Sequence, residues 1–450
     1  MKVNVAGAGA GKTTMMADLI TNTDIPEGKI VYCIAFTNAA TENIKHKVVL
    51  KLGSIPKNIK ISTIHSFLYQ EIINPFHYFL YGKQFEKLSV INLPSNARLR
   101  QIKLSELEEN NILHFTKIPE IAKWIVYKKS GDRKKTKDIR KNILQQFSDY
   151  CSAIYVDEAQ DISSDIRLIL EVFDKAGINI ILYGDPKQDI KGLGHFKAII
   201  NNSDNVNYIS KCHRCPQKHL VLSNSLASIS EQQIADNKNA KGSIVIIFES
   251  DLESLKEFIS HGNYGLQYIS QKRDRFFTHK RQEKKEKFEA VRYEIFKAMA
   301  DKWNALKSDL EINRVAFYIT EQMMNSYNGN NESILISKWI NNGAFGKLSK
   351  KQFAQIASNL HTEDTSEYDF PVVSSIESIK GLEAERCLFI LSTDLAPYLF
   401  REKTEDNKIS HLLYVALTRS SNHLTFLITK EVEEKYKRNN IVKFFSIIEQ

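Results

Sequence analysis

A segment near the start of the chain combines glycines with a lysine and two threonines in a spacing that suits phosphate binding. Glycines let backbone N–H groups turn toward phosphate oxygens, and the N-terminus of a following helix adds to the attraction. The lysine of such a loop reaches the β- and γ-phosphates, and the first threonine hydroxyl is a ligand for Mg²⁺. We therefore expect this phosphate-binding loop (P-loop) to hold the phosphates of a nucleotide and Mg²⁺ through Ala6, Gly7, Ala8, Gly9, Ala10, Gly11, Lys12, Thr13 and Thr14.

Two adjacent carboxylates follow a predicted buried strand further along the chain. The strand Ala153–Val156 leads directly into Asp157 and Glu158. We expect Asp157 to hold Mg²⁺ through water, beside the Thr13 ligand, and Glu158 to polarise an attacking water. The structural alternative is an acidic helix N-terminus, where such residues interact favourably with the helix dipole. The P-loop upstream favours the catalytic interpretation.

The pair Cys212-x-x-Cys215 has a spacing found in zinc sites and in redox pairs. A four-ligand zinc site needs a second pair, and the other cysteines, Cys33, Cys151 and Cys387, are isolated in the sequence. We therefore interpret Cys212 and Cys215 as packing residues.

These residues lie in a regular alternation of predicted strands and helices, which indicates βαβ units and parallel sheets. The first set of predicted strands comprises Val3–Val5, Lys29–Phe36, Ile59–Ser62, Ala153–Val156 and Asn179–Tyr183. The second set comprises Val206–Ile209, Ser243–Phe248, Val372–Ile376, Cys387–Leu391 and Leu424–Ile428. The expected fold class is α/β, with two layers that are each interrupted by a mainly helical insertion.

The alternation also predicts the domain boundaries. The first α/β domain is expected to comprise residues 1–75 and 145–205, interrupted by a helical, basic insertion at residues 76–144. The second α/β domain is expected to comprise residues 206–276 and 368–450, interrupted by a reduced helical insertion at residues 277–367.

Basic charge is concentrated in two stretches of a chain whose net charge is +9. Residues 123–141 contain nine basic and two acidic residues, and residues 271–297 contain ten basic and five acidic residues. These stretches contribute +7 and +5, so the rest of the chain sums to −3. Local positive charge is typical of proteins that bind nucleic acid, and also of solvated helix faces.

The composition excludes several other classes of protein. Hydrophobic residues make up 42% of the chain and charged residues 26%, a balance typical of globular proteins and not of disordered ones. Apolar runs are too short to cross a bilayer, and the N-terminus has the pattern of a strand, so we expect neither a membrane segment nor a signal peptide. Five cysteines at irregular spacing favour a reducing, cytoplasmic location.

The carboxylate segment resembles motif II of the UvrD/Rep branch of superfamily 1 helicases, and further segments resemble other motifs of that family in family order. They span residues 6–419. The resemblance is carried by Ala35–Ala40 (AFTNAA, motif Ia), Ser62–Phe67 (STIHSF, the TxHSF motif), Tyr155–Asp161 (YVDEAQD, motif II), Tyr183–Gln188 (YGDPKQ, motif III), Cys212–Pro216 (CHRCP, motif IV), Ser375–Glu383 (SIESIKGLE, motif V) and Leu413–Arg419 (LYVALTR, motif VI).

This resemblance implies two RecA-like P-loop NTPase domains that face each other across an ATP cleft, and 3′ to 5′ movement along single-stranded or partly duplex DNA. It implies that Gln188 senses the γ-phosphate and that Glu383 bonds the nucleotide ribose. Arg214 and Arg419 would reach across the cleft and neutralise the developing charge on the phosphate.

The resemblance also implies a set of residues that face single-stranded DNA, with a phenylalanine as a platform on which a base stacks. These residues are Phe36, Thr37, Asn38, Thr63, His65 and Ser66. Considered alone, Phe36 ends an apolar run and also suits a core position, and His65 also suits a helix cap.

The sequence departs from the family pattern at several positions. Ala6 replaces the usual first glycine, and only five residues precede it, so a preference for adenine is inferred from the family alone. Glu377 stands where the family usually has histidine. The family usually has aromatic residues directly after motif III, against the DNA bases, whereas this chain has only Phe196, at a different position. These departures leave the NTPase residues in place but do not favour processive unwinding.

Two other functions are compatible with these motifs. The first is a regulatory NTPase that senses DNA or nucleotides and switches a partner. In this respect a small UvrD-like protein of this size resembles the helicase-like subunit of the bacterial anti-phage Gabija system. That subunit forms a complex with an OLD-family nuclease. The second is a nuclease–helicase fusion, but a RecB-type nuclease needs a C-terminal carboxylate cluster, and we expect the stretch after Arg419 to be too short for it.

Overall fold

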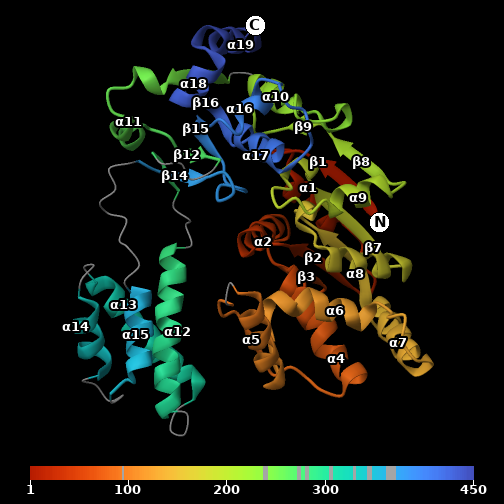
Figure 1. Ribbon diagram of the computed structural model, residues 1–450. Helices are drawn as coiled ribbons and strands as arrows, with labels where there is room; N and C mark the ends of the chain where they lie inside the picture. Colours follow the sequence, from red (N-terminus) through yellow and green to blue (C-terminus); the bar gives the residue numbers. More distant parts are fainter. Residues whose placement is uncertain are drawn as a thin grey trace.

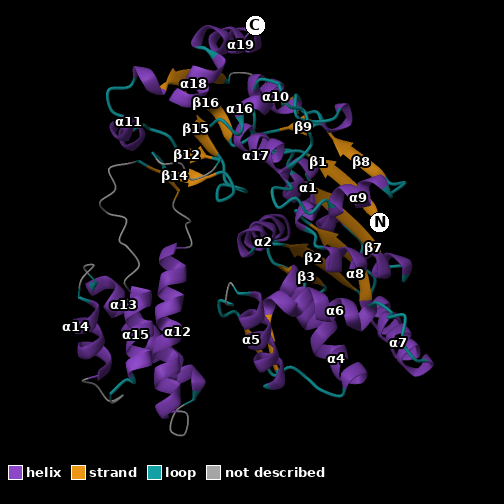
Figure 2. Ribbon diagram, in the orientation of Figure 1, coloured by secondary structure: helices purple, strands orange, loops and turns teal. Residues whose placement is uncertain are grey.

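The computed structural model places two parallel six-stranded sheets in separate parts of the molecule (Figure 1). The structure describes residues 1–93, 96–236, 242–270, 275–278, 283–303, 308–327, 331–341, 347–360 and 371–449. Helices lie on either side of each sheet, and the described parts of the two insertions are mainly helical (Figure 2). The expected fold class, α/β with two parallel sheets, is confirmed. Within the described residues, no helix has the length and apolar character needed to cross a bilayer.

The first sheet has the strand order β3-β2-β6-β7-β1-β8. Its strands are apolar and buried on both faces, as expected for a parallel sheet covered by helices. In β2, Tyr32 and Ile34 pack into the core on one face, and Val31 and Cys33 pack into the core on the other. The strands are β1 (Lys2–Ala6), β2 (Ile30–Ala35), β3 (Ile59–Thr63), β6 (Cys151–Val156), β7 (Asn179–Gly184) and β8 (Val206–Ile209). Their helices are α1 (Lys12–Asn22), α2 (Asn38–Leu52), α3 (Ile64–Phe67), α8 (Ser164–Lys175) and α9 (His195–Asn201), with short 3₁₀ turns at Ala159–Asp161 and Pro186–Gln188.

The strand β8 corrects the expected boundary at residue 206. It pairs in parallel with β1, from Val3 opposite Val206 to Ala6 opposite Ile209, and so completes the first sheet instead of opening the second domain. Without β8, β1 would be an edge strand with unpaired backbone groups, beside the P-loop that it supports. After β8, a short parallel pair, β9 (Lys211–Cys212) and β10 (Ile234–Ala235), leads toward the second sheet.

The first insertion is helical apart from one short pair of parallel strands. Helix α6 buries Ala122 and Ile125 in the core of the first domain. The strands β4 (Lys87–Ser89) and β5 (Ile112–His114) were not expected, because segments of three residues are too short to show an alternating pattern. The helices are α4 (Asn74–Tyr81), which continues from a π-helical segment at Leu68–Ile73, α5 (Ala97–Glu109), α6 (Ile118–Val126), preceded by a 3₁₀ turn at Phe115–Lys117, and α7 (Lys134–Tyr150).

The second sheet has the strand order β11-β16-β15-β12-β14-β13. Its longest strands, β15 and β16, lie side by side inside the sheet, and the last five residues of each are buried. The strands are β11 (Ser243–Phe248), β12 (Leu266–Ile269), β13 (Phe277–Thr278), β14 (Val372–Ser375), β15 (Ala384–Leu391) and β16 (Ser420–Ile428). The helices are α10 (Gln217–Asn224), α11 (Leu255–His261), α16 (Ala396–Leu399), α17 (Lys408–Leu417), α18 (Lys430–Tyr436) and α19 (Arg438–Glu449), with 3₁₀ turns at Ile229–Glu231 and Glu249–Asp251.

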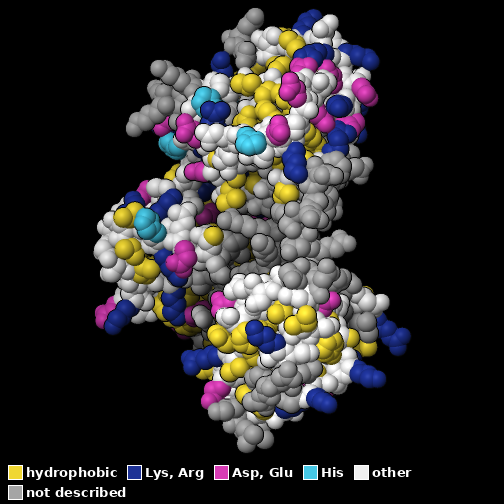
Figure 3. All heavy atoms as spheres, turned by 90° about the vertical axis from the view of Figure 1, so that its left-hand side faces the viewer, with side chains coloured by type: hydrophobic (Ala, Val, Ile, Leu, Met, Phe, Trp, Pro, Cys, Tyr) yellow, Lys and Arg dark blue, Asp and Glu magenta, His cyan; other side chains and the backbone are white. Residues whose placement is uncertain are grey.

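The second insertion leaves the second sheet after β13 and returns before β14, and it has a core of its own. Several of its large apolar side chains are exposed, namely Leu310, Phe317, Tyr318 and Ile334. Figure 3 looks at this side of the molecule, and hydrophobic side chains are visible on its lower lobe among Lys and Arg. The insertion consists of α12 (Glu283–Trp303), α13 (Asp309–Ser326), α14 (Glu332–Ile336), a π-helical segment at Ser337–Asn341, and α15 (Lys350–Leu360).

Candidate nucleotide site between the two sheets

The P-loop connects the end of β1 at Ala6 to the start of α1 at Lys12. Gly9 and Gly11 have φ angles of 72° and 77°, in the left-handed region that favours glycine. Gly11 is the N-cap of α1, and no side chain caps this helix end. The N–H of Thr14 donates to the carbonyl oxygen of Gly11 at 2.9 Å, so the N–H groups that an anion can use are those at the very start of the helix, where the helix dipole also attracts it.

Lys12 provides the positive charge of this loop. Its ammonium group donates hydrogen bonds to the carbonyl oxygens of Ala6 at 3.2 Å and Gly7 at 3.3 Å. The same charge acts to lower the pKa values of Asp157, Glu158 and Asp185. The Lys12 charge thus favours the ionised form of all three carboxyl groups.

Thr13 and Asp157 form a donor set that suits Mg²⁺. The Thr13 hydroxyl donates to Asp157 Oδ2 at 3.0 Å, and the Asp157 side chain is buried at the end of β6. Mg²⁺ prefers oxygen ligands and is usually held by one or two carboxylates together with phosphate oxygens and water. Burial and the adjacent charge of Glu158 raise the pKa of Asp157 to about 6, against the opposing effects of Lys12 and Thr13.

Glu158 follows Asp157 in an unusual backbone conformation, with a φ of 55°. Such left-handed geometry is strained for a residue other than glycine and is concentrated at functional sites. Its carboxylate accepts a hydrogen bond from Gln160. Burial acts to raise the pKa of Glu158, but Lys12, the Gln160 hydrogen bond, Lys380 and Arg419 outweigh it and lower that pKa. Glu158 is therefore ionised and able to accept a proton from water.

Gln160, which the sequence analysis did not identify, connects Glu158 to the end of the neighbouring strand β7. Its side-chain oxygen accepts a hydrogen bond from the backbone N–H of Asp185 at 3.0 Å. Gln188 in turn donates to Asp185 Oδ2 at 2.8 Å, and all three side chains are buried. The predicted γ-phosphate sensor Gln188 is thus held in one network with Glu158.

The second half of the chain contacts the P-loop at Ala8 through a ring of three hydrogen bonds. The N–H of Ala8 donates to the Tyr414 hydroxyl at 3.3 Å, and that hydroxyl donates to Gln233 Oε1 at 3.3 Å. The Gln233 amide then donates to the carbonyl oxygen of Ala8 at 3.2 Å. A Cβ atom on Gly7 would lie 2.3 Å from the end of the Gln233 side chain, so a larger residue at position 7 would displace Gln233 from this ring. The motif VI resemblance includes Tyr414, whereas no local pattern indicates Gln233.

Arg214 also approaches the P-loop from this side. A Cβ atom on Gly9 would lie 2.5 Å from Arg214 Cβ. The Arg214 guanidinium forms an ion pair with Glu383 and donates to the carbonyl oxygen of Thr418 at 3.4 Å. The structure therefore brings the predicted residues Arg214 and Glu383 together beside the P-loop.

Arg419 is buried at the end of α17, with 1% of its surface exposed. It donates to the carbonyl oxygens of Val415 at 3.0 Å and Leu382 at 3.2 Å, and to the Thr418 hydroxyl at 3.2 Å. Burial and the nearby charge of Arg214 lower its pKa. The guanidinium is thus held by its own domain, while its charge acts on Glu158 of the other domain.

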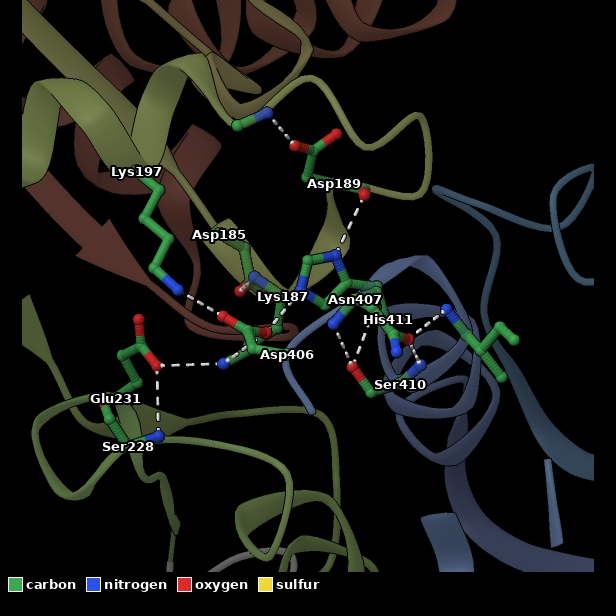
Figure 4. A network of polar contacts seen from close by, with 12 residues as sticks. Asp185, Lys187, Asp189, Lys197, Ser228, Glu231, Asp406, Asn407, Ser410 and His411 are labelled. Atoms are coloured by element: carbon green, nitrogen blue, oxygen red, sulfur yellow. Dashed lines mark hydrogen bonds and ion pairs between the residues drawn. The ribbon is translucent and has the colours of Figure 1, made fainter. Parts of the chain in front are cut away.

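Ion pairs beside this site join the two domains. Lys187 and Lys197 of the first domain point toward Asp406 of the second (Figure 4), with Lys187 at 3.0 Å and Lys197 at 2.5 Å. His411 contacts Asp406 at 2.8 Å and the carbonyl oxygen of Asp189 at 3.0 Å. The hydrogen bond with His411, followed by those from Lys197 and Lys187, holds the pKa of Asp406 well below its usual range despite burial.

The residues predicted to face DNA follow β2 and β3, which are neighbours in the sheet. Phe36 is partly buried against the core of the first domain. Thr37 caps α2 by accepting from Ala40 N–H at 3.1 Å, and Thr63 caps α3 by accepting from Ser66 N–H at 3.3 Å. The cap of α3 is therefore Thr63 and not His65.

The remaining residues of this set, Asn38 and His65, lie at the same edge of the sheet. Asn38 is exposed in the first turn of α2. The His65 ring lies 6.2 Å from the Phe115 ring, and burial together with Lys191 lowers its pKa.

Part of the basic stretch at residues 123–141 has a structural role. Arg140 is buried, pairs with Asp132 at 2.9 Å and donates to the carbonyl oxygen of Ile125 at 3.0 Å. Lys123 pairs with Asp165 at 2.7 Å. In contrast, exposed lysines remain on α7, at Lys134, Lys135 and Lys137. Of the second basic stretch, residues 271–274 and 279–282 lie outside the described residues.

The structure gives Cys212 and Cys215 no partner set for zinc. Among the residues that the structure describes, no group of three or more His, Cys, Asp or Glu is arranged to hold a metal ion. Both cysteines are free and buried, and both lie in a small apolar cluster with Leu220.

Comparison with known proteins gives a family match in the first part of the chain. A family model described as an AAA domain matches residues 1–193. This range contains the P-loop, Asp157, Glu158 and Gln188. None of the curated proteins matches the chain.

Two solved helicase structures align with most of this chain at low identity. A complex of the arterivirus nonstructural protein 10 helicase with DNA is 11% identical, with a TM-score of 0.37, over 96% of this chain and 62% of that chain. The structure of the PRRSV helicase is 9% identical, with a TM-score of 0.36, over 95% of this chain and 52% of that chain. This chain therefore covers less than two thirds of either helicase.

Proposed function

We propose that this protein is an ATP-dependent translocase or helicase of the UvrD/Rep type that acts on single-stranded or partly duplex DNA with 3′ to 5′ polarity. The observation that carries the proposal is the contact between Thr13 and Asp157, with Lys12 and Glu158 beside it. A nucleotide site of this kind needs a cation ligand pair, a phosphate-binding lysine and a base for water, and these residues supply all three.

The proposed hydrolysis step uses residues of both domains. Bound Mg²⁺ would supply a charge that neutralises the phosphates, with Thr13 and Asp157 as its protein ligands. Lys12 would bind the β- and γ-phosphates, and Glu158 would accept the proton of the attacking water. Gln188 would orient the water or γ-phosphate from its place on Asp185. Arg214 and Arg419 would neutralise the charge that develops in the transition state.

Movement along DNA would follow from opening and closing of the site between the domains. Lys380 of the second domain pairs with Asp161 of the first at 2.9 Å, close to Glu158. Contacts of this kind have to break and form again when the domains move, so they link the state of the nucleotide to the relative position of the sheets. Glu383, now paired with Arg214, would exchange that partner for the ribose.

The proposed DNA path runs along the edge where β2 and β3 end. Phe36, Thr37 and Asn38 follow one strand. Thr63 is the last residue of the next strand, and His65 and Ser66 follow it. The exposed lysines of α7 belong to the insertion on the same domain and would contact the phosphate backbone.

A second candidate function is a regulatory NTPase that senses DNA or nucleotides and controls a partner nuclease, as in a Gabija-like anti-phage complex with an OLD-family nuclease. Two observations favour it. Phe196, an aromatic residue after motif III, is 2% exposed and packs against Gly184, so it cannot stack on a base. The second insertion exposes Phe317 and Tyr318, apolar side chains that suit a protein partner better than a phosphate backbone. For both candidates, we propose a location in the cytoplasm.

Two assays on the purified chain test the proposal. The first measures ATP hydrolysis with and without single-stranded DNA, and we expect DNA to stimulate it. The second measures unwinding of a forked duplex with a 3′ tail. Unwinding supports the helicase, and DNA-stimulated hydrolysis without unwinding supports the regulatory NTPase. The absence of any ATP hydrolysis, with and without DNA, would refute both.

A further inference from the structure

Cys212 and Cys215 lie in direct contact with each other. Cys212 ends β9, and the backbone N–H of Cys215 donates a hydrogen bond to Cys212 Sγ at 3.3 Å across the intervening turn. Each of the two thiols also shifts the pKa of the other. Both thiols are free and fully buried. The turn therefore holds the two sulfur atoms next to one another.

This pair of thiols touches both halves of the nucleotide site. The Cys212 thiol donates to the carbonyl oxygen of Ala8 in the P-loop at 3.2 Å. The Cys215 thiol donates to the carbonyl oxygen of Thr418 at 3.6 Å, next to Arg419. The turn between the cysteines carries Arg214, which pairs with Glu383. A covalent change at either sulfur would therefore alter contacts of the P-loop and of the arginines.

Cys212 has the chemical character of a reactive thiol. Its hydrogen bond with Cys215, the backbone N–H groups of Cys215 and Arg214, and the charge of Arg214 lower its pKa to about 6, against the effect of burial. A thiolate is the nucleophile in thiol–disulfide exchange. In contrast, burial raises the pKa of Cys151 to about 12 and that of Cys387 to about 11, and it raises the pKa of Cys33 further.

We propose that Cys212 and Cys215 form a redox-active dithiol whose oxidation to an intramolecular disulfide switches off the nucleotide site. The Cys212 thiolate attacks a low-molecular-weight disulfide, forms a mixed disulfide and releases one thiolate. Cys215 then gives up its proton, attacks Cys212 Sγ and displaces the second thiolate. Overall, the two cysteine thiols are oxidised, and one external disulfide is reduced to two thiols.

The second step becomes easier after the first. The hydrogen bond with Cys212, followed by burial and the Cys212 charge, raises the pKa of Cys215 well above its usual value. A mixed disulfide at Cys212 removes that thiolate charge, so Cys215 ionises more easily and becomes the resolving thiol.

Oxidation changes the contacts that the two sulfur atoms make with the site. A disulfide brings the sulfur atoms to about 2.05 Å and leaves Cys215 without a proton to donate. The carbonyl oxygen of Thr418 then has no thiol donor, Cys212 Sγ moves relative to the carbonyl oxygen of Ala8, and the turn that carries Arg214 tightens. Because both sulfurs are buried, an external disulfide reaches them only when this turn separates from the P-loop. The effect on turnover rests on the proposed ATPase function, whereas formation of the disulfide does not.

The experiment treats the full chain with oxidised glutathione at pH 7.5 and identifies disulfides by peptide mass spectrometry. We expect one disulfide, between Cys212 and Cys215, with Cys33, Cys151 and Cys387 still reduced. Turnover of ATP should fall by about 10²-fold, the order of loss for a misplacement of ~1 Å in a catalytic site, and should return after reduction with dithiothreitol. Hydrogen exchange of residues 6–13 should increase in the oxidised protein.

Two variants serve as controls. Cys215→Ser lacks the resolving thiol, so oxidation should stop at a glutathione adduct on Cys212. Cys151→Ser should behave as the wild type, because Cys151 lies away from the dithiol at the start of β6. If the reduced protein hydrolyses no ATP, the proposed function fails, and the mass spectra and hydrogen exchange still decide the redox proposal. A missing Cys212–Cys215 disulfide, or a disulfide that changes neither turnover nor exchange of the P-loop, overturns it.

Discussion

The Tyr414 hydroxyl accepts a hydrogen bond from the backbone N–H of Ala8 at 3.3 Å, although the two residues are 406 positions apart in the sequence. Gln233 closes this contact into a ring, since it accepts from Tyr414 and donates back to Ala8. The conformation of the P-loop at Ala8 is therefore controlled by two side chains outside the first sheet.

Tyr414→Phe tests this control. The change removes only the hydroxyl and leaves a buried N–H on Ala8 without that partner, so we expect the melting temperature to fall, with a cost of about 1–3 kcal/mol. The KM for ATP should rise as well, because Ala8 is part of the loop. Tyr268→Phe is the matched control: its hydroxyl donates to the carbonyl oxygen of Ala416 within the second domain. An equal rise in KM in both variants would show that the effect is general destabilisation.

Glu158→Gln tests the proposed base. The amide keeps the shape of the side chain but cannot accept a proton, so turnover should fall by ~10² or more while ATP binding survives. Lys12→Ala provides the comparison, because loss of the lysine should remove both binding and turnover. Binding is measured with a fluorescent ATP analogue and turnover by phosphate release. If Glu158→Gln loses both in parallel, as Lys12→Ala does, Glu158 has a structural role.

The raised pKa of Asp157 predicts a pH dependence of stability. The folded protein keeps a proton on Asp157 up to about pH 6, whereas the carboxyl group of the unfolded chain loses it near its ordinary value of 3.8. The unfolded state thus binds fewer protons between these values, so this residue's contribution to the unfolding free energy falls as the pH rises through that range. Above pH 6 the loss is complete, on the order of 3 kcal/mol at ~1.4 kcal/mol per pKa unit.

Asp157→Asn removes this titration. In the absence of Mg²⁺ and nucleotide, we expect the variant to melt at a higher temperature than the wild type at pH 7.5 and to show a flatter pH profile between pH 4 and 6. Asp138→Asn, at an exposed position on α7, serves as the control. Parallel profiles for the wild type and Asp157→Asn would contradict the assigned burial of the charge.

The motifs were enough to predict that the P-loop and Asp157 would lie close together, because each motif is local. The P-loop is one strand–loop–helix unit, and Asp157 and Glu158 directly follow a strand with a clear apolar pattern. Parallel strands end at the same edge of a sheet, so the fold class implied that these residues would meet.

Contacts across long sequence distances could not be predicted in this way. Gln233 contacts Ala8 at a separation of 225 residues, and nothing in its neighbours marks it. The four residues of β8 have a strand pattern but carry no information about which sheet they join. In the sequence, Arg140 is one of several basic residues in a charged stretch, and such residues are normally exposed. It is buried in the structure because it pairs with Asp132 in the folded insertion.

Neutralising the exposed lysines of α7 tests the proposed DNA contact. Replacing Lys134, Lys135 and Lys137 with Gln should weaken binding to single strands and flatten its salt dependence, by about 0.7 in the log–log slope for each phosphate that is no longer neutralised. Fluorescence anisotropy with a labelled oligonucleotide over a range of salt concentrations measures this slope. The control replaces three exposed lysines on α18 and α19, namely Lys430, Lys435 and Lys443. An unchanged slope in the α7 variant would assign these lysines to a solvated helix face.

Arg419→Ala tests whether the two domains form one catalytic site. The guanidinium donates to three oxygens of its own domain, and its charge also lowers the pKa of Glu158 in the other domain. If that charge stabilises the transition state, kcat should fall by ~10³ with a smaller effect on ATP binding.

The removal of these hydrogen bonds in Arg419→Ala also lowers stability, since buried carbonyl oxygens of Val415 and Leu382 are left without this donor. Arg419→Lys separates the two effects, because it keeps the charge while it gives up most of the hydrogen bonds. We expect Arg419→Lys to keep more turnover than Arg419→Ala at a similar melting temperature. If single-stranded DNA stimulates the wild type by favouring a closed arrangement of the domains, as we propose, Arg419→Ala should also lose most of that stimulation. Normal, DNA-stimulated turnover in a folded Arg419→Ala protein would refute a shared site.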